Sequence, residues 1–371
     1  MKIGIDAHTL GSQSSGNEHY YLQLITEFAK GEFGSNRYVV YFTRMSALQR
    51  IPKAEHFDLK RIWPRTPYFR IPFAFPMECR LEKLDVFHAQ FIVPPFCNCG
   101  TVTTIPDILF EAYPEFFAPV ENLWLRALIP WSARRADHII TVSHFSKSEI
   151  VNRYHISPEK ITVTNEAPRD EFRVLDKEEC REQISRRYRI DSPFVLYVGR
   201  VQARKNLLRL LEAFYAVRRD DNQHKLVIVG KQDWSGQKVI QKVHELSIQS
   251  HVTFTGYVNW DDLPIFYNAA EAFVFPSICE GFGVPIVEAM ACGLPVVTSY
   301  GSSLEEVAGG AAVLADPYSV DSIAKAMEKV LFDPNLRSSL RERGLRRAAE
   351  FSGSRKAQQT IAAYQKVCTN R

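Results

Sequence analysis

The sequence predicts an α/β protein that contains two doubly wound parallel-sheet domains. Short apolar runs rich in β-branched residues recur along the chain, and a helical pattern follows each run. These runs do not alternate polar with apolar residues, which is typical of strands that helices bury on both faces. The length of 371 residues corresponds to between two and three domains of about 150 residues. Alternation of strand and helix indicates α/β architecture.

The predicted strands form two groups along the chain. In the first half they are Lys2–Asp6, Tyr38–Phe42, Asp85–His88, Thr101–Ile105, His138–Ser143 and Ile161–Thr164. In the second half they are Phe194–Gly199, Lys225–Gly230, Val252–Tyr257, Ala272–Pro276, Pro295–Ser299 and Ala312–Ala315. Ligands of doubly wound sheets bind outside the carboxyl ends of the strands. We therefore expect the functional residues in the loops that follow these runs.

A charged segment between residues 165 and 193 lacks strand character, and we interpret it as the link between the domains. The last segment, from about residue 353 to 371, places Ala357, Ile361 and Tyr364 near one face of a helix. We expect this helix to return to the first domain. The predicted domains are therefore residues 1–170 together with 352–371, and residues 171–351, facing each other across a cleft.

Composition excludes several classes of protein. Apolar residues make up 46% and charged residues 24% of the chain, close to globular averages, which excludes a disordered tail, a collagenous repeat or a coiled coil. The net charge of +4 is weak for a chain of this size, whereas nucleic-acid binders carry a denser basic face. We expect no nucleic-acid partner.

The cysteines and the N-terminus indicate a cytoplasmic protein. The seven cysteines are an odd number, and only Cys97 and Cys99 lie close in sequence, without zinc-ligand spacing. Free thiols fit a reducing compartment. The N-terminal strand has no signal-peptide core, and no run reaches the roughly 18 apolar residues that span a bilayer. We expect a soluble, cytoplasmic chain with no metal.

The strongest local signal is the segment from residue 279 to 291, CEGFGVPIVEAMA. Gly281 and Gly283 let the backbone approach a ligand closely, and the proline that follows them suits the first turn of a helix. Glu280 then lies in the loop before the helix and Glu288 about one turn inside it. Both can point at a ligand whose phosphate lies on the helix N-terminus. The alternative is a glycine turn with a capping acid.

A second signal follows the first strand of the second domain. Arg200 and Lys205 lie between that strand and the next helix, where a guanidinium fork and a lysine point charge suit a diphosphate. The alternative is a solvated basic loop. A third signal is the small, hydroxyl-rich loop Gly11–Asn17, which can close over a phosphate or serve as a plain flexible connection.

Several familiar motifs are absent from the sequence. No Asp-x-Asp pair occurs, so a metal-chelating carboxylate pair of that form is excluded. Neither a Gly-x-Ser-x-Gly elbow nor a Walker A loop is present. The third glycine of the dinucleotide fingerprint is replaced by Ile286.

Taken together, these motifs resemble the retaining glycosyltransferases of the GT-B fold, family four, over nearly the whole chain. Glu280 and Glu288 match the Glu-x7-Glu motif, and Gly199-Arg200 with Lys205 matches the family's basic loop. Further matching segments are Arg135-Ala136-Asp137, Val142-Ser143, Phe145-Ser146, Leu304-Glu305-Glu306-Val307, Asp316-Pro317 and Phe351-Ser352. The resemblance implies two Rossmann-like domains, the first on the acceptor side and the second binding the nucleotide sugar.

The resemblance also implies roles for individual residues. Glu288 binds ribose hydroxyls, Glu280 binds hydroxyls of the transferred sugar, and Arg200 and Lys205 hold the diphosphate. Further donor contacts are the backbone around Gly281, Phe282, Gly283 and Val284, the first loop at Gly16, and the base-flanking residues Gly256, Tyr257 and Val258. The catalytic set is then Glu280, Arg200, Lys205 and Asp107. No cofactor is implied, since the nucleoside diphosphate sugar is a co-substrate.

The chain departs from the family pattern where acceptors bind. The usual His before Asp107 is Pro106, so an imidazole contact is missing there and Asp107 is a candidate for acceptor binding. The family's Asn-Gly near the domain link is Asn165-Glu166, and its Trp after Phe-Ser is Gly353. These changes concern the acceptor more than the donor.

The resulting hypothesis is a retaining, metal-independent hexosyltransferase of the bacterial polysaccharide type. It moves a hexose from a UDP- or GDP-sugar to a hydroxyl of a glycan or lipid-linked acceptor. The alternatives are a GT-B epimerase, hydrolase or phosphorylase, and a non-catalytic nucleotide-sugar sensor. For a phosphorylase we find no pyridoxal-phosphate lysine motif.

Two aromatic segments with cations, residues 69–76 and 124–135, suggest peripheral contact with the inner face of a membrane. The alternative for both segments is packing against the core or along an acceptor groove.

Overall fold

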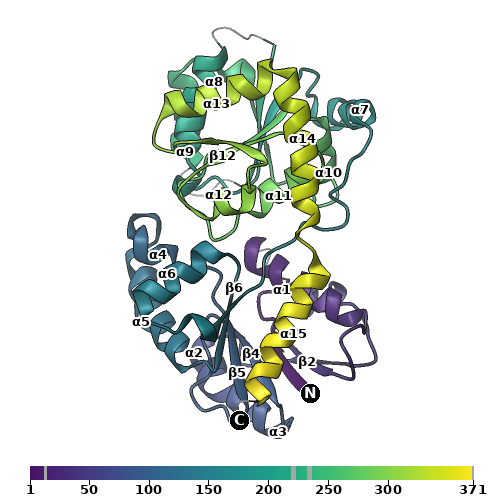
Figure 1. Ribbon diagram of the computed structural model, residues 1–371, viewed down its shortest axis with the longest axis vertical. Helices are drawn as coiled ribbons and strands as arrows, with labels where there is room; N and C mark the ends of the chain where they lie inside the picture. The colour runs from purple at the N-terminus through teal and green to yellow at the C-terminus, as the bar shows by residue number, and fades with distance from the viewer. Residues whose placement is uncertain (12–14, 219–222, 232–235, 370–371) are drawn as a thin grey trace. The chain divides into compact units, whose positions relative to one another are not determined.

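The chain folds into two compact units, each organised around its own parallel sheet (Figure 1). The computed structural model describes residues 1–11, 15–218, 223–231 and 236–369. Unit 1 contains residues 1–166 and 352–371, and unit 2 contains residues 167–351. The first boundary predicted from the sequence, 170/171, lies four residues after the observed one, and the second, 351/352, coincides with the observed one.

Unit 1 has a seven-stranded sheet in the order β3-β2-β1-β4-β5-β6-β7. Its strands are β1 (Lys2–Asp6), β2 (Arg37–Phe42), β3 (Phe57–Arg61), β4 (Val86–Gln90), β5 (Gly100–Thr104), β6 (His138–Thr141) and β7 (Ile161–Val163). Its α-helices are α1 (Ser15–Ala29), α2 (Pro67–Phe69), α3 (Phe75–Leu81), α4 (Leu109–Ala112), α5 (Pro119–Arg135), α6 (His144–Tyr154) and α15 (Gly353–Thr369). Every neighbouring pair of strands is parallel.

Unit 2 has a six-stranded parallel sheet in the order β10-β9-β8-β11-β12-β13. Its strands are β8 (Phe194–Val198), β9 (Lys225–Val229), β10 (Val252–Gly256), β11 (Ala272–Phe275), β12 (Val296–Ser299) and β13 (Ala312–Ala315). Its α-helices are α7 (Lys177–Tyr188), α8 (Leu207–Arg218), α9 (Gly236–Glu245), α10 (Leu263–Ala269), α11 (Val284–Ala291), α12 (Ser303–Ala308), α13 (Val320–Phe332) and α14 (Pro334–Ala349).

The α/β prediction with two doubly wound sheets is confirmed. Each predicted strand matches an observed strand, and the two ends agree to within two residues. Strand β3 is missing from the prediction. It lies at the edge of the sheet and pairs with β2 alone. Because an edge strand is partly exposed to solvent, the charged residues Asp58 and Lys60 alternate along it with apolar residues. A search for continuous apolar runs does not find such a strand.

The interpretation of residues 165–193 as a link is wrong for its second half, which forms helix α7. Asp176 caps this helix, its side chain accepting a hydrogen bond from the Glu179 N–H at 2.8 Å. Cys180 and Ile184 are buried one turn apart on a helix that packs against α10. The capping pair and this spacing were signals available in the sequence.

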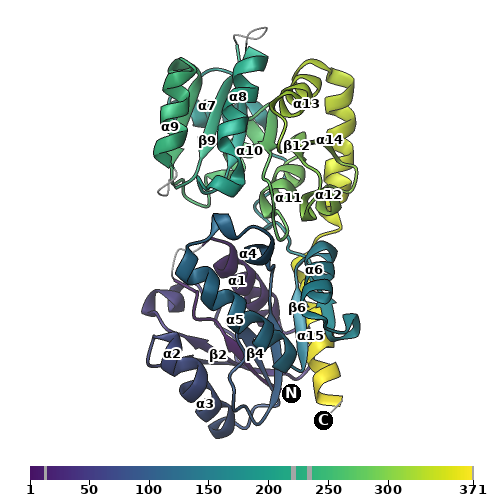
Figure 2. The ribbon, with the colours of Figure 1, turned by 90° about the vertical axis from the view of Figure 1, so that its left-hand side faces the viewer.

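The terminal helix α15 belongs to unit 1, where it packs on α1 and on strands β4 to β7 (Figures 1 and 2). Lys356 on α15 is fully buried and forms a 2.8 Å ion pair with Glu166. Farther along the helix, the Tyr364 hydroxyl lies 2.6 Å from Nδ1 of buried His88. Polar side chains thus anchor α15 within the core of unit 1.

The buried ion pair makes the attachment of α15 sensitive to a single truncation. Lys356→Ala leaves the Glu166 carboxylate buried without its cation, which costs about 3–5 kcal/mol. We expect a matching fall in the free energy of unfolding, measured by urea denaturation. Lys366→Ala, on an exposed position of the same helix, is the control. Equal stability of the two variants would contradict this role for Lys356.

Candidate functional site

The order of strands in unit 2 reverses between β8 and β11. In doubly wound sheets the loops at such a switch point carry the ligand site. The loop after β8 contains Arg200, Arg204 and Lys205, and the loop after β11 leads through Glu280 to helix α11. The sheet topology therefore brings together the two strongest sequence signals.

Hydrogen bonds fix these two loops against each other. The Ile278 N–H donates to the Arg204 carbonyl at 2.8 Å, and the Asn206 amide donates to the carbonyls of Pro276 and Pro317. Asn206 has a positive φ of 63°, a left-handed conformation that asparagine tolerates better than most residues. The loops thus form one rigid edge at the carboxyl ends of β8 and β11.

Glu280 is the centre of this edge and is buried. Its Oε1 accepts hydrogen bonds from Lys205 Nζ at 2.5 Å and from the Ser277 hydroxyl at 2.6 Å. Its Oε2 accepts from the Arg204 guanidinium at 2.7 Å. A single carboxylate therefore holds two cations that come from the neighbouring strand's loop.

Opposite charges in this cluster stabilise the ionised forms of Glu280 and Lys205. Burial alone raises the pKa of Glu280, but Arg204, Lys205 and the Ser277 hydroxyl together lower it to about 2. Burial and the charge of Arg204 lower the pKa of Lys205 to about 8, while Glu280 acts in the opposite direction. At neutral pH the carboxylate is ionised and the ammonium is mostly protonated. The cluster then carries an excess of one positive charge, which suits an anionic ligand.

The backbone next to Glu280 also favours an anion. Gly283 has a φ of 103°, and a Cβ there would lie 2.4 Å from Leu304 Cδ2, so only glycine fits this close approach. The Ser303 hydroxyl donates to the carbonyls of Glu280 and Phe282 and fixes the loop. No side chain among the described residues caps the start of α11. Pro285 has no N–H and the Ile286 N–H donates to the Gly283 carbonyl, so the Val284 N–H is the donor that the helix start offers to a ligand such as phosphate.

Glu288 lies just over one turn inside α11, as predicted, and is buried. Its Oε2 accepts a 3.0 Å hydrogen bond from the Tyr267 hydroxyl, and no other hydrogen bond to its carboxylate occurs within the described residues. Burial raises the pKa of Glu288 to about 7, although Tyr267 and the charge of Arg169 act to lower it. Glu288 is thus a carboxylate with a vacant acceptor oxygen at the same helix.

The two predicted diphosphate cations differ in burial. Lys205 is buried in the Glu280 cluster, whereas Arg200 is exposed and has no ion-pair partner in the part of the chain that the structure describes. At the neighbouring strand ends, the Gly230 N–H donates to the Gly256 carbonyl. Tyr257 is half exposed, with Lys231 Nζ 5.1 Å from its ring centre, and Val258 is buried. These residues occupy the same sheet edge as Lys205.

The strand order in unit 1 reverses between β1 and β4, so the loop after β1 lies at that sheet's switch point. Residues 12–14 of the predicted loop lie outside the described residues. Gly16 belongs to the first turn of α1, is exposed, and has open space where a Cβ would be. Asp107 lies in the loop after β5, where its carboxylate accepts a 3.2 Å hydrogen bond from the Leu109 N–H.

Comparison with known proteins agrees with this arrangement. Residues 15–165 match the family model "Glycosyltransferase Family 4", and residues 181–347 match "Glycosyl transferases group 1". The O-antigen chain mannosyltransferase B of Escherichia coli is 34% identical over 280 residues, covering 75% of this chain and 74% of that protein. The chain is a family-four glycosyltransferase with the GT-B fold.

Two further matches are consistent with this membership. The O-antigen chain mannosyltransferase RfbU of Salmonella typhimurium is 30% identical over 228 residues, covering 61% of this glycosyltransferase and 60% of the relative. The sucrose-phosphate synthase structure from Thermosynechococcus elongatus aligns with a TM-score of 0.82 and 20% identity, covering 100% of both chains. This structural likeness shows the fold.

Sequence reasoning missed three side chains of the cluster. Arg204 stands beside Lys205 in the same basic loop, so a second arginine there was a visible signal. The Ser277 hydroxyl donates a hydrogen bond to Glu280, and the Tyr267 hydroxyl donates one to Glu288. Neither residue belongs to the motifs found in the sequence. The assignments of Glu280, Glu288, Lys205, Arg200, Asp107, Gly16 and the segments 256–258 and 281–284 to donor or catalysis stay predictions.

The aromatic segments predicted to contact a membrane are divided between surface and core. Phe69, Phe73 and Trp124 are more than half exposed, whereas Phe75 and Ile129 belong to the core. Packing explains the buried residues, and membrane contact through the exposed ones stays a prediction. Among the described residues, no helix combines the length and the apolar character needed to cross a membrane.

The opposing pKa shifts of Glu288 and Lys205 predict a bell-shaped pH profile for the affinity of a sugar nucleotide. If Glu288 accepts hydrogen bonds from ribose hydroxyls, as the family resemblance implies, it must lose a proton at pH values below about 7, so affinity falls by up to about tenfold per pH unit. Above about 8 Lys205 loses its charge and affinity falls again. Calorimetric titration between pH 5.5 and 9 measures both limbs.

Glu288→Gln is the matched control for this profile, because it keeps the size of the side chain and removes its titration. We expect the variant to lose the acidic limb and retain the alkaline one. An acidic limb that persists unchanged in Glu288→Gln would contradict the assignment of the limb to Glu288.

Proposed function

We propose that this glycosyltransferase is a retaining mannosyltransferase of polysaccharide biosynthesis, acting on a glycan or lipid-linked acceptor of the O-antigen type. The names of the relatives from Escherichia coli and Salmonella typhimurium support the sugar and the acceptor class. The donor is a nucleoside diphosphate mannose, with GDP or UDP as the nucleotide. The observation that carries the proposal is the cluster at the switch point of unit 2, in which buried Glu280 pairs with buried Lys205 and with partly exposed Arg204.

The cluster is suited to a diphosphate leaving group. When the bond between the anomeric carbon and the phosphate oxygen breaks, negative charge develops on the diphosphate. Within the described residues Lys205 Nζ donates to Glu280 alone, so two of its three N–H donors remain for phosphate oxygens. The Val284 N–H at the start of α11 adds a further fixed donor. Preorganised donors of this kind stabilise developing charge without reorganisation.

We propose that no protein nucleophile takes part. Both oxygens of Glu280 accept hydrogen bonds, and a carboxylate with a pKa of about 2 is a weak base. In the proposed step the acceptor oxygen bonds to the anomeric carbon on the face that the leaving group vacates. Its proton passes to the departing phosphate oxygen, which balances the reaction and retains the anomeric configuration. Glu280 positions the cations and binds hydroxyls of the sugar.

We also propose that the reaction needs no divalent metal ion. Lys205, Arg204 and the N-terminus of α11 supply the positive charge that a metal would otherwise provide. Pro106, in place of the family's His, leaves Asp107 as the polar side chain of that loop, and we propose that Asp107 contacts the acceptor. Turnover that persists in EDTA is the expected result.

The proposed function is tested with purified protein and a panel of GDP-mannose, UDP-glucose and UDP-galactose. A donor at 100 times its Kd raises the free energy of unfolding by about 2.7 kcal/mol, and we expect this thermal shift with a mannosyl donor. With an oligosaccharide acceptor, NMR of the first product should show the anomeric configuration of the donor. An inverted product would contradict retention, and the absence of a shift with every donor would contradict the donor site.

Variants separate the residues of the cluster in the same assay. Lys205→Met should lower kcat/KM by about 100-fold or more, since removal of one preorganised donor has that effect. Arg200→Ala tests the exposed arginine, and a kcat/KM within about twofold of the native value would remove Arg200 from the diphosphate site. Binding without turnover would favour the nucleotide-sugar sensor, and release of free nucleotide without glycan product would favour the epimerase or hydrolase.

A further inference from the structure

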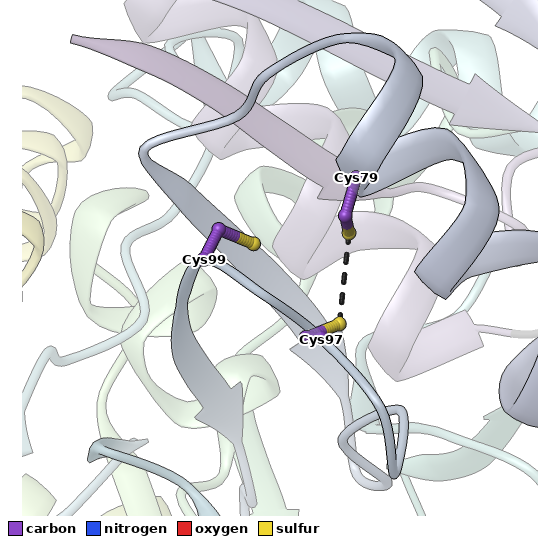
Figure 3. A group of neighbouring side chains, drawn as sticks. All are labelled: Cys79, Cys97 and Cys99. Atoms are coloured by element: carbon purple, nitrogen blue, oxygen red, sulfur yellow. Dashed lines mark hydrogen bonds between the residues drawn. The ribbon is translucent and has the colours of Figure 1, made fainter.

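Three cysteines that are separated in the sequence meet in unit 1 (Figure 3). Cys79 lies on α3, and Cys97 and Cys99 lie on the segment that leads into β5. The sulfur atoms all lie within 4.8 Å of one another, and Cys79 Sγ is 3.6 Å from Cys97 Sγ. No disulfide joins them. Only Cys97 and Cys99 are neighbours in the sequence, whereas Cys79 lies on a helix, 18 residues before Cys97.

We infer that Cys79, Cys97 and Cys99 form a binding site for one thiophilic divalent metal ion of the Zn²⁺ class, with a water molecule as fourth ligand. The geometry carries the inference. A zinc–sulfur bond is about 2.3 Å long, so a sulfur pair at 3.6 Å subtends about 103° at the metal, close to a tetrahedral angle. The third sulfur, Cys99 Sγ, lies within 4.8 Å of the other two. A shift of about 1 Å brings it to bonding distance from a metal ion held by Cys79 and Cys97.

The surroundings of the cluster suit a metal–thiolate site. Cys79 and Cys99 are part of the hydrophobic core that includes Tyr41 and Phe87, and Cys97 packs against that core. Soft thiolate ligands in a dry apolar shell select zinc-like ions over hard cations. Cys97 is half-buried, which gives an ion and its water ligand a path from solvent.

Binding of a cation changes the protonation of these thiols. Hydrogen bonds with Cys97 and Cys99, together with burial, raise the pKa of the Cys79 thiol, so this thiol is protonated in the empty protein. A bound divalent ion displaces the three thiol protons and neutralises two of the three charges that result. Metal uptake must therefore release protons, and this release is measurable by itself.

Tyr41 supplies a second polar feature near these sulfurs. Its hydroxyl is buried and has no hydrogen-bond partner among the described residues. Burial, followed by nearby carboxylates and the sulfurs of Cys79 and Cys99, raises the pKa of this phenol. An unpaired buried donor is unfavourable, and metal-bound thiolates are better acceptors for it than neutral thiols.

The position of the cluster indicates a structural role. Cys99 directly precedes Gly100, the first residue of β5, so the cluster lies at the amino end of that strand. Ligand sites of doubly wound sheets lie at the opposite, carboxyl ends. A metal here would tie α3 to the segment before β5. Met77 and Phe96, which flank these cysteines in sequence, line one apolar groove of about 270 Å³ whose walls the metal would fix.

The test titrates the fully reduced, metal-free protein with Co²⁺ as a spectroscopic probe, and then with Zn²⁺. We expect one equivalent of Co²⁺ to produce thiolate-to-metal charge-transfer absorption and the visible bands of a tetrahedral site. One equivalent of Zn²⁺ should abolish both signals and release protons. Zn²⁺ should also raise the melting temperature of the full-length chain.

Cys97→Ala is the decisive variant, because the half-buried position tolerates truncation, and its far-UV circular dichroism confirms the fold. It should weaken Co²⁺ and Zn²⁺ binding by about 100-fold or more, since even loss of an outer-shell partner weakens binding by 10–100-fold. Cys368→Ala, which removes a thiol on α15, should leave binding unchanged.

Three results would overturn the site: no tetrahedral Co²⁺ spectrum in the reduced native protein, equal binding by Cys97→Ala, or the loss of binding in Cys368→Ala.

Discussion

The ion pairs of the buried Glu280 carboxylate are the interaction on which the proposed donor site depends. Its two oxygens hold Lys205 and Arg204 from the loop after β8, and Ser277 orients it from its own loop. A buried lysine and a partly exposed arginine side by side repel each other, so the pair requires an anion between them. With Glu280 present, both cations stay charged at a defined place at the edge of the sheet. Under the proposed function, these cations are in place for a diphosphate before any ligand binds.

The sheet topology explains why this cluster forms where it does. In each unit the strand order reverses once, between β1 and β4 and between β8 and β11, and the loops after these strands diverge to leave room for a ligand. At the switch point of unit 2 lie the charged side chains of Glu280, Lys205 and Arg204. Glu288 on α11 adds a buried acceptor that Tyr267 orients. Unit 1 places the exposed Gly16 at its own switch point. The same architecture thus carries two different surfaces.

The buried strands and the positions of Glu280 and Glu288 were predictable from the sequence because they depend on local patterns. Continuous apolar runs gave the buried strands, and the spacing from Glu280 to Glu288 placed one carboxylate in the loop and one in the helix. The features that the sequence did not predict depend on tertiary context. Edge strand β3 is half exposed and therefore alternates. The grouping of Arg204 with Glu280, and of Cys79 with Cys97 and Cys99, joins segments that only the folded chain brings together.

The central claim is that Glu280 keeps Lys205 charged for the diphosphate. The most direct measurement is calorimetric titration of Glu280→Gln and native protein with a nucleoside diphosphate and with the corresponding nucleoside, at pH 8 and pH 6. The affinity ratio of the two ligands isolates the diphosphate, because both share the ribose contact with Glu288. Without Glu280 the pKa of Lys205 falls below about 8, so the ratio should drop at pH 8 and recover at pH 6. An identical ratio for both proteins at both pH values would contradict the account.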